Sequence, residues 1–103
     1  MSIVNKEEQI VVKLAAGYLE PTGGVINSDN FTEFQHRLQQ HIQLLIDRNF
    51  EGLVQLMYRI DIEEKDFTFV LHYAPPEKIA ERISDLIIKR LLQKAYFRLN
   101  YSP

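Results

Sequence analysis

The stretch from Pro75 to Leu99 constrains the fold of this chain more than any other. Pro75 and Pro76 stand where the first turn of a helix tolerates proline, because the N–H that proline lacks would have no intrahelical partner there. Glu77 follows them, and lysines and arginines gather toward the other end, which matches the helix dipole. These features predict one long helix at about residues 76–98.

Apolar residues cover this predicted helix along two neighbouring stripes, with the three- and four-residue steps of helical faces. The first stripe contains Ile79, Ile83, Leu86, Ile87, Leu91 and Ala95, and the second contains Ile88, Leu92, Tyr96 and Leu99. Two stripes require two neighbours. Burial in a core is the commonest reason for such stripes, so we expect earlier segments to cover the helix. A second copy of the chain is the alternative neighbour for one stripe.

Length and composition limit the remaining possibilities. A chain of 103 residues fits one domain with one core, and 46% hydrophobic and 25% charged residues are typical of a globular protein. The net charge of −2 argues against a nucleic-acid partner, because phosphates are bound by clustered Lys and Arg. The absence of cysteine excludes disulfides and thiolate chemistry and fits a reducing compartment.

Targeting signals are not evident in the sequence. The first ten residues, MSIVNKEEQI, carry Glu7 and Glu8 where a signal peptide needs a long apolar run. No apolar stretch approaches the length of a membrane span. We therefore expect a cytoplasmic protein without a membrane partner.

The first half of the chain predicts two helices and a loop. Residues 5–18 have helical spacing, although Ile10-Val11-Val12 would also suit a strand. Residues 20–29 contain Pro, Gly, Asn and Ser and predict a mobile loop. A second helix should begin at Asp29 or Asn30, either of which can cap it, and run to about Arg48. Its expected inward stripe is Phe31, Phe34, Leu38, Ile42, Leu45 and Ile46.

Two shorter helices are expected before the long one. Asn49 can cap a third helix that runs to Ile60. Asp61, with Glu64 three positions later, has the pattern of a capping box for a fourth helix to about residue 73. The run Phe67-Thr-Phe-Val also suits a strand, which leaves an extended segment as the alternative. We predict a single all-α domain over residues 1–103, with four or five helices packed around the C-terminal one.

No group of reactive residues has the spacing of a known site. Glu33 and His36 form a Glu-x-x-His step, but a di-iron bundle needs a second such pair, which the sequence lacks. His36 and His41 are five residues apart, unlike the His-x-x-x-His of zinc helices. Gly23-Gly24 lacks the rest of a phosphate-loop motif. We therefore predict no catalytic residue, no cofactor and no metal ligand, and we do not expect an enzyme.

Charged residues inside apolar runs are the more informative polar positions. Arg59 lies in LMYRIDI and Asp85 in ISDLIIKR. A bidentate ion pair between them would fix how two helices pack against each other, so we predict Arg59–Asp85 as a structural pair. Perturbed charged groups also mark active sites, which is the alternative interpretation.

These two runs carry a family resemblance. The pattern L-x-Y-R-I-D-I-x-E, residues 56–64, followed by D-L-I-I-x-R-x-L-Q-K, residues 85–94, resembles a group of short, functionally uncharacterised bacterial proteins. The resemblance covers roughly residues 42–98. It implies a compact α-helical fold, and it implies no activity, cofactor or ligand.

Three classes of function follow from these observations. The first is a protein-interaction or scaffold module that contacts a protein partner, or a second copy of itself in a homodimer, through the C-terminal helix. The face expected for this role is Ile88, Leu92, Tyr96, Phe97 and Tyr101. The second is a helix-turn-helix nucleic-acid binder, with a turn at Asn49 or Asp61 and the cations Lys89, Arg90, Lys94 and Arg98. The third, an enzyme, would require a pocket that the sequence does not reveal.

Overall fold

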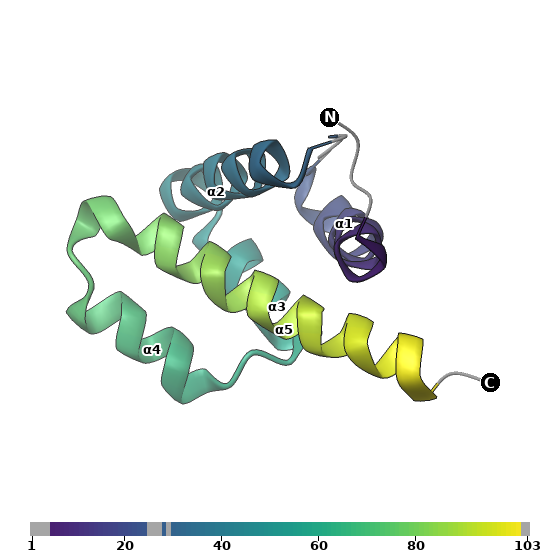
Figure 1. The fold of residues 1–103 in the computed structure, drawn as a ribbon. Helices are drawn as coiled ribbons and strands as arrows, with labels where there is room; N and C mark the ends of the chain where they lie inside the picture. Colours follow the sequence, from purple (N-terminus) through teal and green to yellow (C-terminus); the bar gives the residue numbers. More distant parts are fainter. Residues whose placement is uncertain (1–4, 25–27, 29, 102–103) are drawn as a thin grey trace.

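A computed structural model describes residues 5–24, 28 and 30–101 of the chain. Within these ranges it contains five α-helices, two short 3-10 helices and no strand (Figure 1). In chain order they are α1 (Lys6–Leu19), η1 (Glu20–Thr22), α2 (Phe31–Arg48), α3 (Phe50–Ile60), α4 (Glu64–Tyr73), η2 (Pro76–Lys78) and α5 (Ile79–Tyr101). The prediction of an all-α fold is confirmed.

Helix α5 is the longest element, and α1, α2, α3 and α4 all contact it. Figure 1 shows α4 beside the first half of α5, where the two helices run in opposite directions. The core around α5 contains side chains from every helix, among them Val11, Phe34, Leu38, Ile42, Leu53, Leu56, Ile60, Phe67, Val70, Ile83, Ile87 and Leu91. The prediction that earlier segments pack around a long C-terminal helix is therefore confirmed.

Asparagine side chains cap the first three helices. The side-chain oxygens of Asn5, Asn30 and Asn49 each accept a hydrogen bond from the backbone N–H three residues later, at 3.1, 3.1 and 3.0 Å. An N-cap of this kind satisfies one of the N–H groups that the first helical turn leaves unpaired. The predicted helix starts at Asn30 and Asn49 are confirmed, and α1 shows that the strand alternative for residues 10–12 is wrong.

The connection between α3 and α4 differs from the prediction. Asp61 ends α3 in a left-handed conformation with φ 66°, and its N–H donates to the carbonyls of Met57 and Tyr58. The N-cap of α4 is Glu63, which makes no side-chain capping bond. The predicted fourth helix, ending at about residue 73, is confirmed, but it begins at Glu64. The predicted role of Asp61 as its cap is wrong, because Asp61 ends the preceding helix instead.

The predicted loop at residues 20–29 begins with ordered structure. Residues Glu20–Thr22 form a 3-10 turn, and Gly23 follows with φ 79°, a left-handed conformation that glycine adopts without steric cost. Residues 25–27 and 29 lie outside the described part of the chain, so the predicted mobility of this loop remains a prediction. None of the helices in the described ranges has the length and apolar character needed to cross a membrane.

Candidate functional site

The last two turns of α5 extend beyond the helices that cover the rest of it (Figure 1). The 23 residues of α5 make it about 35 Å long, whereas the 14 residues of α1 and the 10 of α4 give about 21 and 15 Å. A single neighbour of this length therefore covers only part of α5. Ala95 is the last buried residue of α5, and every residue from 96 to 101 is exposed.

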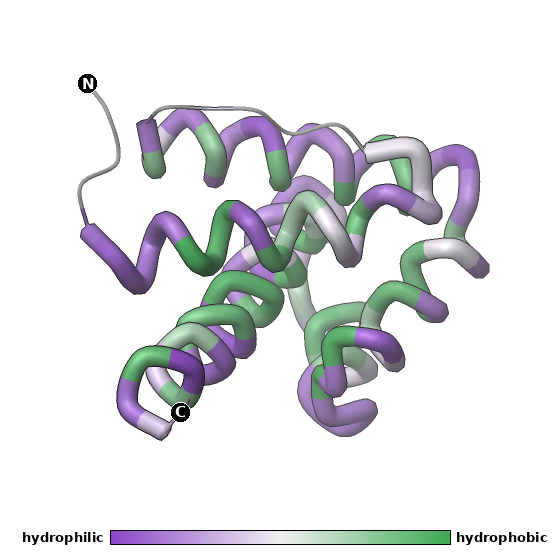
Figure 2. Tube along the Cα trace, turned by 90° about the vertical axis from the view of Figure 1, so that its right-hand side faces the viewer, coloured by the Kyte–Doolittle hydropathy of each residue, from purple (hydrophilic) through white to green (hydrophobic). Residues whose placement is uncertain are grey.

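This uncovered end carries large hydrophobic side chains. Tyr96, Phe97, Leu99 and Tyr101 are 49%, 59%, 43% and 68% exposed, and we call these four residues the aromatic end of α5. Figure 2 shows this end pointing toward the viewer, with hydrophobic residues recurring along α5. The solvent-exposed end of a helix usually carries polar residues, so a group of exposed aromatic residues there needs an explanation.

The three rings of the aromatic end contact one another. The ring centroids of Phe97 and Tyr101 are 5.2 Å apart, as expected for neighbours one helical turn apart. Tyr96 meets Phe97 edge-on with an interplanar angle of 81° and a centroid distance of 6.2 Å. These are ordinary distances for aromatic pairs. The rings therefore form one connected hydrophobic surface and are not isolated exposed side chains.

Only part of the interaction face expected from the sequence is exposed in the structure. Tyr96, Phe97 and Tyr101 are exposed, but Ile88 is only 7% exposed and Leu92 is partly buried against the core. The prediction that Ile88 and Leu92 belong to an open face is corrected, because other helices cover this side of α5 before its last turns. A charged residue at Ile88 would disrupt the core, so it cannot test self-association.

Only positive charges accompany the aromatic end. The sequence contains no Asp or Glu after Asp85, whereas Lys89, Arg90, Lys94 and Arg98 all follow it. The ammonium group of Lys94 lies 5.8 Å from the ring centroid of Tyr18 in α1 and 4.0 Å from the carboxylate of Asp61. The side chain of Arg98 forms no ion pair or hydrogen bond with the described part of the chain.

The predicted pair of Arg59 and Asp85 does not form. The Arg59 guanidinium donates to the backbone carbonyl of Tyr18 at 3.1 Å. The side chain of Asp85 is mostly exposed. The partial burial of its carboxyl group and the nearby charge of Glu81 both raise the pKa of this group, whereas a cationic partner would lower the pKa. The residue that pairs with α5 is instead Asp61, at the end of α3, whose carboxylate lies 3.9 Å from Arg90 and 4.0 Å from Lys94.

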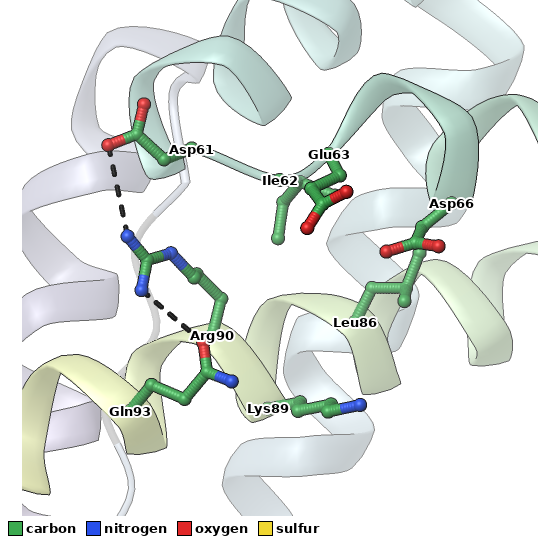
Figure 3. Close-up of a pocket in the computed structure, with 8 residues that line it drawn as sticks. All are labelled: Asp61, Ile62, Glu63, Asp66, Leu86, Lys89, Arg90 and Gln93. Carbon is green, nitrogen blue, oxygen red and sulfur yellow. Dashed lines mark hydrogen bonds and ion pairs between the residues drawn. The ribbon is translucent and has the colours of Figure 1, made fainter.

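The ion pair of Asp61 with Arg90 lies in a shallow polar groove between α5 and the connection from α3 to α4 (Figure 3). The groove has a volume of about 310 Å³ and is lined by Asp61, Ile62, Glu63, Asp66, Leu86, Lys89, Arg90 and Gln93. Arg90 donates a second bond to the side-chain oxygen of Gln93 at 3.3 Å. Carboxylates on one side of the groove face cations on the other, and this mixture of charges suggests no particular ligand.

A second exposed aromatic group, on α4, was not expected from the sequence. Phe69 and Tyr73 are 61% and 73% exposed, and their ring centroids are 4.9 Å apart. They lie off the buried side of α4, which carries Phe67 and Val70. The signal was present in the sequence, because in a helix these two residues lie one turn apart and outside the inward stripe. The sequence of residues 67–70 also suits a strand, and in a strand these two residues would not lie on one exposed helical side.

The residues considered as metal ligands, Glu33, His36 and His41, do not come together in a site. Glu33 pairs with Arg37 at 2.6 Å on the surface of α2, which lowers the pKa of its carboxyl group. His36 is exposed on the same helix. His41 Nε2 lies 2.8 Å from the hydroxyl oxygen of Thr22. Across residues 5–24, 28 and 30–101, no three His, Cys, Asp or Glu side chains come together as metal ligands would.

Comparisons of this chain with protein-family models, with curated proteins and with solved structures find no match. The resemblance of residues 56–64 and 85–94 to a group of bacterial proteins therefore remains a prediction.

Proposed function

We propose that this chain is a small protein-interaction module that associates with a second copy of itself through the aromatic end of α5. The observation that carries the proposal is the contrast along that helix. Hydrophobic residues on α5 up to Ala95 are buried or partly buried, whereas Tyr96, Phe97, Leu99 and Tyr101 are together in water. Connected exposed hydrophobic surface on a small domain usually marks a contact with another molecule.

The chemistry of this surface supports the proposal. Aromatic residues and arginine are enriched in protein interfaces, while Asp and Glu are depleted in them. The aromatic end combines three aromatic rings with Arg98 and has no carboxylate in its sequence neighbourhood. Tyrosine and phenylalanine also contribute much contact area for the rotamer freedom that they lose. The location remains the cytoplasm in this proposal, which the absence of cysteine supports.

A helix-turn-helix nucleic-acid binder is the competing proposal, and it has weaker support. It would need the four cations of α5 to be available for phosphates. Arg90 and Lys94 instead lie 3.9 and 4.0 Å from the carboxylate of Asp61. Retention of the chain on duplex DNA that weakens with added salt would favour this competing proposal over self-association.

Sedimentation velocity tests self-association directly. We expect the wild type to form a dimer as its concentration rises, and the double variant Phe97→Ser/Tyr101→Ser to stay monomeric. Loss of two interface aromatics should weaken association by at least about 2 kcal/mol, or roughly thirtyfold. Both residues are exposed, so the helical content measured by circular dichroism should not change.

The matched control is Phe50→Ser, which removes an exposed aromatic at the start of α3. This variant should associate like the wild type. A wild-type chain that remains monomeric up to about 1 mM would contradict the proposal, because its association free energy would then be weaker than about −4 kcal/mol.

A further inference from the structure

The exposed aromatics on α4 form a surface with the opposite charge to the aromatic end of α5. Asp66, Phe69 and Tyr73 follow one another at three- and four-residue steps, so they lie along one side of the helix. We call these three residues the α4 surface. We infer that the α4 surface of one copy receives the aromatic end of α5 from a second copy. This inference rests on the proposed self-association and names the surface that completes it.

The α4 surface and the aromatic end of α5 are complementary in charge. Residues 61–66 contain Asp61, Glu63, Glu64 and Asp66 against the single cation Lys65. Asp61 lies close to Arg90 and Lys94, and Glu63 pairs with Lys65 at 3.3 Å. Within the described part of the chain, the Asp66 carboxylate forms no ion pair or hydrogen bond, and neither does the Arg98 guanidinium. Opposite charges beside two apolar surfaces steer them together and fix their register.

The α4 surface and the aromatic end of one copy cannot contact each other. Asp66 and Leu86 line the same groove, so α4 begins beside Leu86 (Figure 3). From there α4 runs toward the start of α5, away from the aromatic end (Figure 1). Phe97 lies about 16 Å further along α5 than Leu86, in the opposite direction. The pairing therefore requires another molecule.

The pairing is compatible with a symmetric dimer. Each copy carries one α4 surface and one aromatic end. Two copies related by a two-fold axis would make the contact twice, since a residue of the first copy contacts a residue of the second and the reverse also holds. Each half of such a dimer would use aromatic anchors bordered by one pair of opposite charges, which is the usual arrangement of a hydrophobic interface centre and a polar rim.

The decisive experiment mixes two full-length variants, each of which has lost a different one of the two surfaces. The first variant, Phe97→Ser/Tyr101→Ser, keeps an intact α4 surface. The second, Phe69→Ser/Tyr73→Ser, keeps an intact aromatic end. We expect each variant alone to be monomeric in sedimentation velocity, and we expect an equimolar mixture to form a heterodimer, because one of the two contacts is then intact.

The outcomes separate this inference from the proposal on which it depends. If Phe69→Ser/Tyr73→Ser dimerises like the wild type while Phe97→Ser/Tyr101→Ser does not, the aromatic ends pair with each other and the inference is wrong, although self-association stands. If the mixture contains only monomers, the inference is also wrong. A monomeric wild type would overturn both.

A charge exchange tests the register of the contact. Arg98→Glu and Asp66→Arg should each weaken dimerisation by about two- to fivefold, as is usual for an exposed ion pair. The double variant Arg98→Glu/Asp66→Arg should restore the wild-type dissociation constant. The matched control is Glu64→Arg, which makes the same charge change on the opposite side of α4 and should have a smaller effect than Asp66→Arg. Failure of the double variant to recover would show that these two residues do not face each other.

Discussion

Asp61 has a backbone conformation that glycine adopts more easily. Its φ of 66° places it in the left-handed region, where an L-residue loses roughly 1–2 kcal/mol to steric contact of its Cβ. Its carboxylate contacts Arg90 and Lys94 at 3.9 and 4.0 Å and is largely exposed, so these pairs add little.

We predict that Asp61→Gly raises the free energy of unfolding by roughly 0.5–1 kcal/mol, after allowing for the greater freedom of glycine in the unfolded chain. Urea denaturation measures the change. Asp61→Ala is the control, because it removes the same ion pairs and keeps the Cβ. An alanine variant more stable than the glycine variant would show that the backbone conformation is not the cause.

His41 connects α2 to the turn that follows α1. The Thr22 hydroxyl donates to the Leu19 carbonyl at 2.7 Å, so its oxygen accepts from the Nε2–H of His41. Burial disfavours the charged ring and lowers the pKa of His41 below its ordinary value of 6.5. The unfolded chain therefore takes up this proton at a higher pH than the folded chain does.

We predict that neutral His41 contributes fully to the free energy of unfolding above about pH 6.5. This contribution of His41 is lost as the pH falls from about 6.5 toward the lower pKa of the folded state. Thermal unfolding between pH 7.5 and 5.5 measures the effect. His41→Gln can still donate to Thr22 but does not titrate, so its melting temperature should fall less over this range. An equal fall in both proteins would contradict the assignment to His41.

At the scale of elements, α4 is the helix held by the fewest buried side chains. Phe67 and Val70 are the buried residues within Glu64–Tyr73, and no side chain caps the N-terminus of this helix. Regions with few buried contacts open locally at a lower free energy than the core. We predict that the backbone amides of α4 exchange with deuterium faster than those around Ile83 and Ile87 in α5, as NMR or mass spectrometry would measure on the monomer. Equal protection would show that α4 opens only with the whole molecule.

The sequence predicted most elements because their signals are local. Asn30 and Asn49 are capping residues followed by helical periodicity, and each one begins a helix. Asp61 was misassigned because a capping residue and a left-handed helix end favour the same amino acid, and the neighbouring backbone decides between them. The run at residues 67–70 was ambiguous because aromatic and β-branched residues suit both a strand and the buried side of a helix.

Prediction from sequence was weaker for the packing of the helices against one another. The second stripe of α5 was recognised, but burial of Ile88 and exposure of Tyr96 depend on where neighbouring helices end. Arg59 and Asp85 were paired incorrectly because the pairing needs the relative positions of two helices. The structure brings Asp61 beside Arg90 instead, and both of these residues lie in the two runs singled out from the sequence.

The uncovered end of α5 also affects how firmly a second copy could be held. Backbone hydrogen bonds of a terminal helical turn with no neighbour open readily, so the last turns should unwind for part of the time in the lone chain. If a second copy binds these turns only when they are helical, only a fraction of the molecules can bind at any moment. The apparent dissociation constant would then rise in inverse proportion to that fraction. The length of α5 would thus make the contact reversible, and a dimer built on it would separate on dilution.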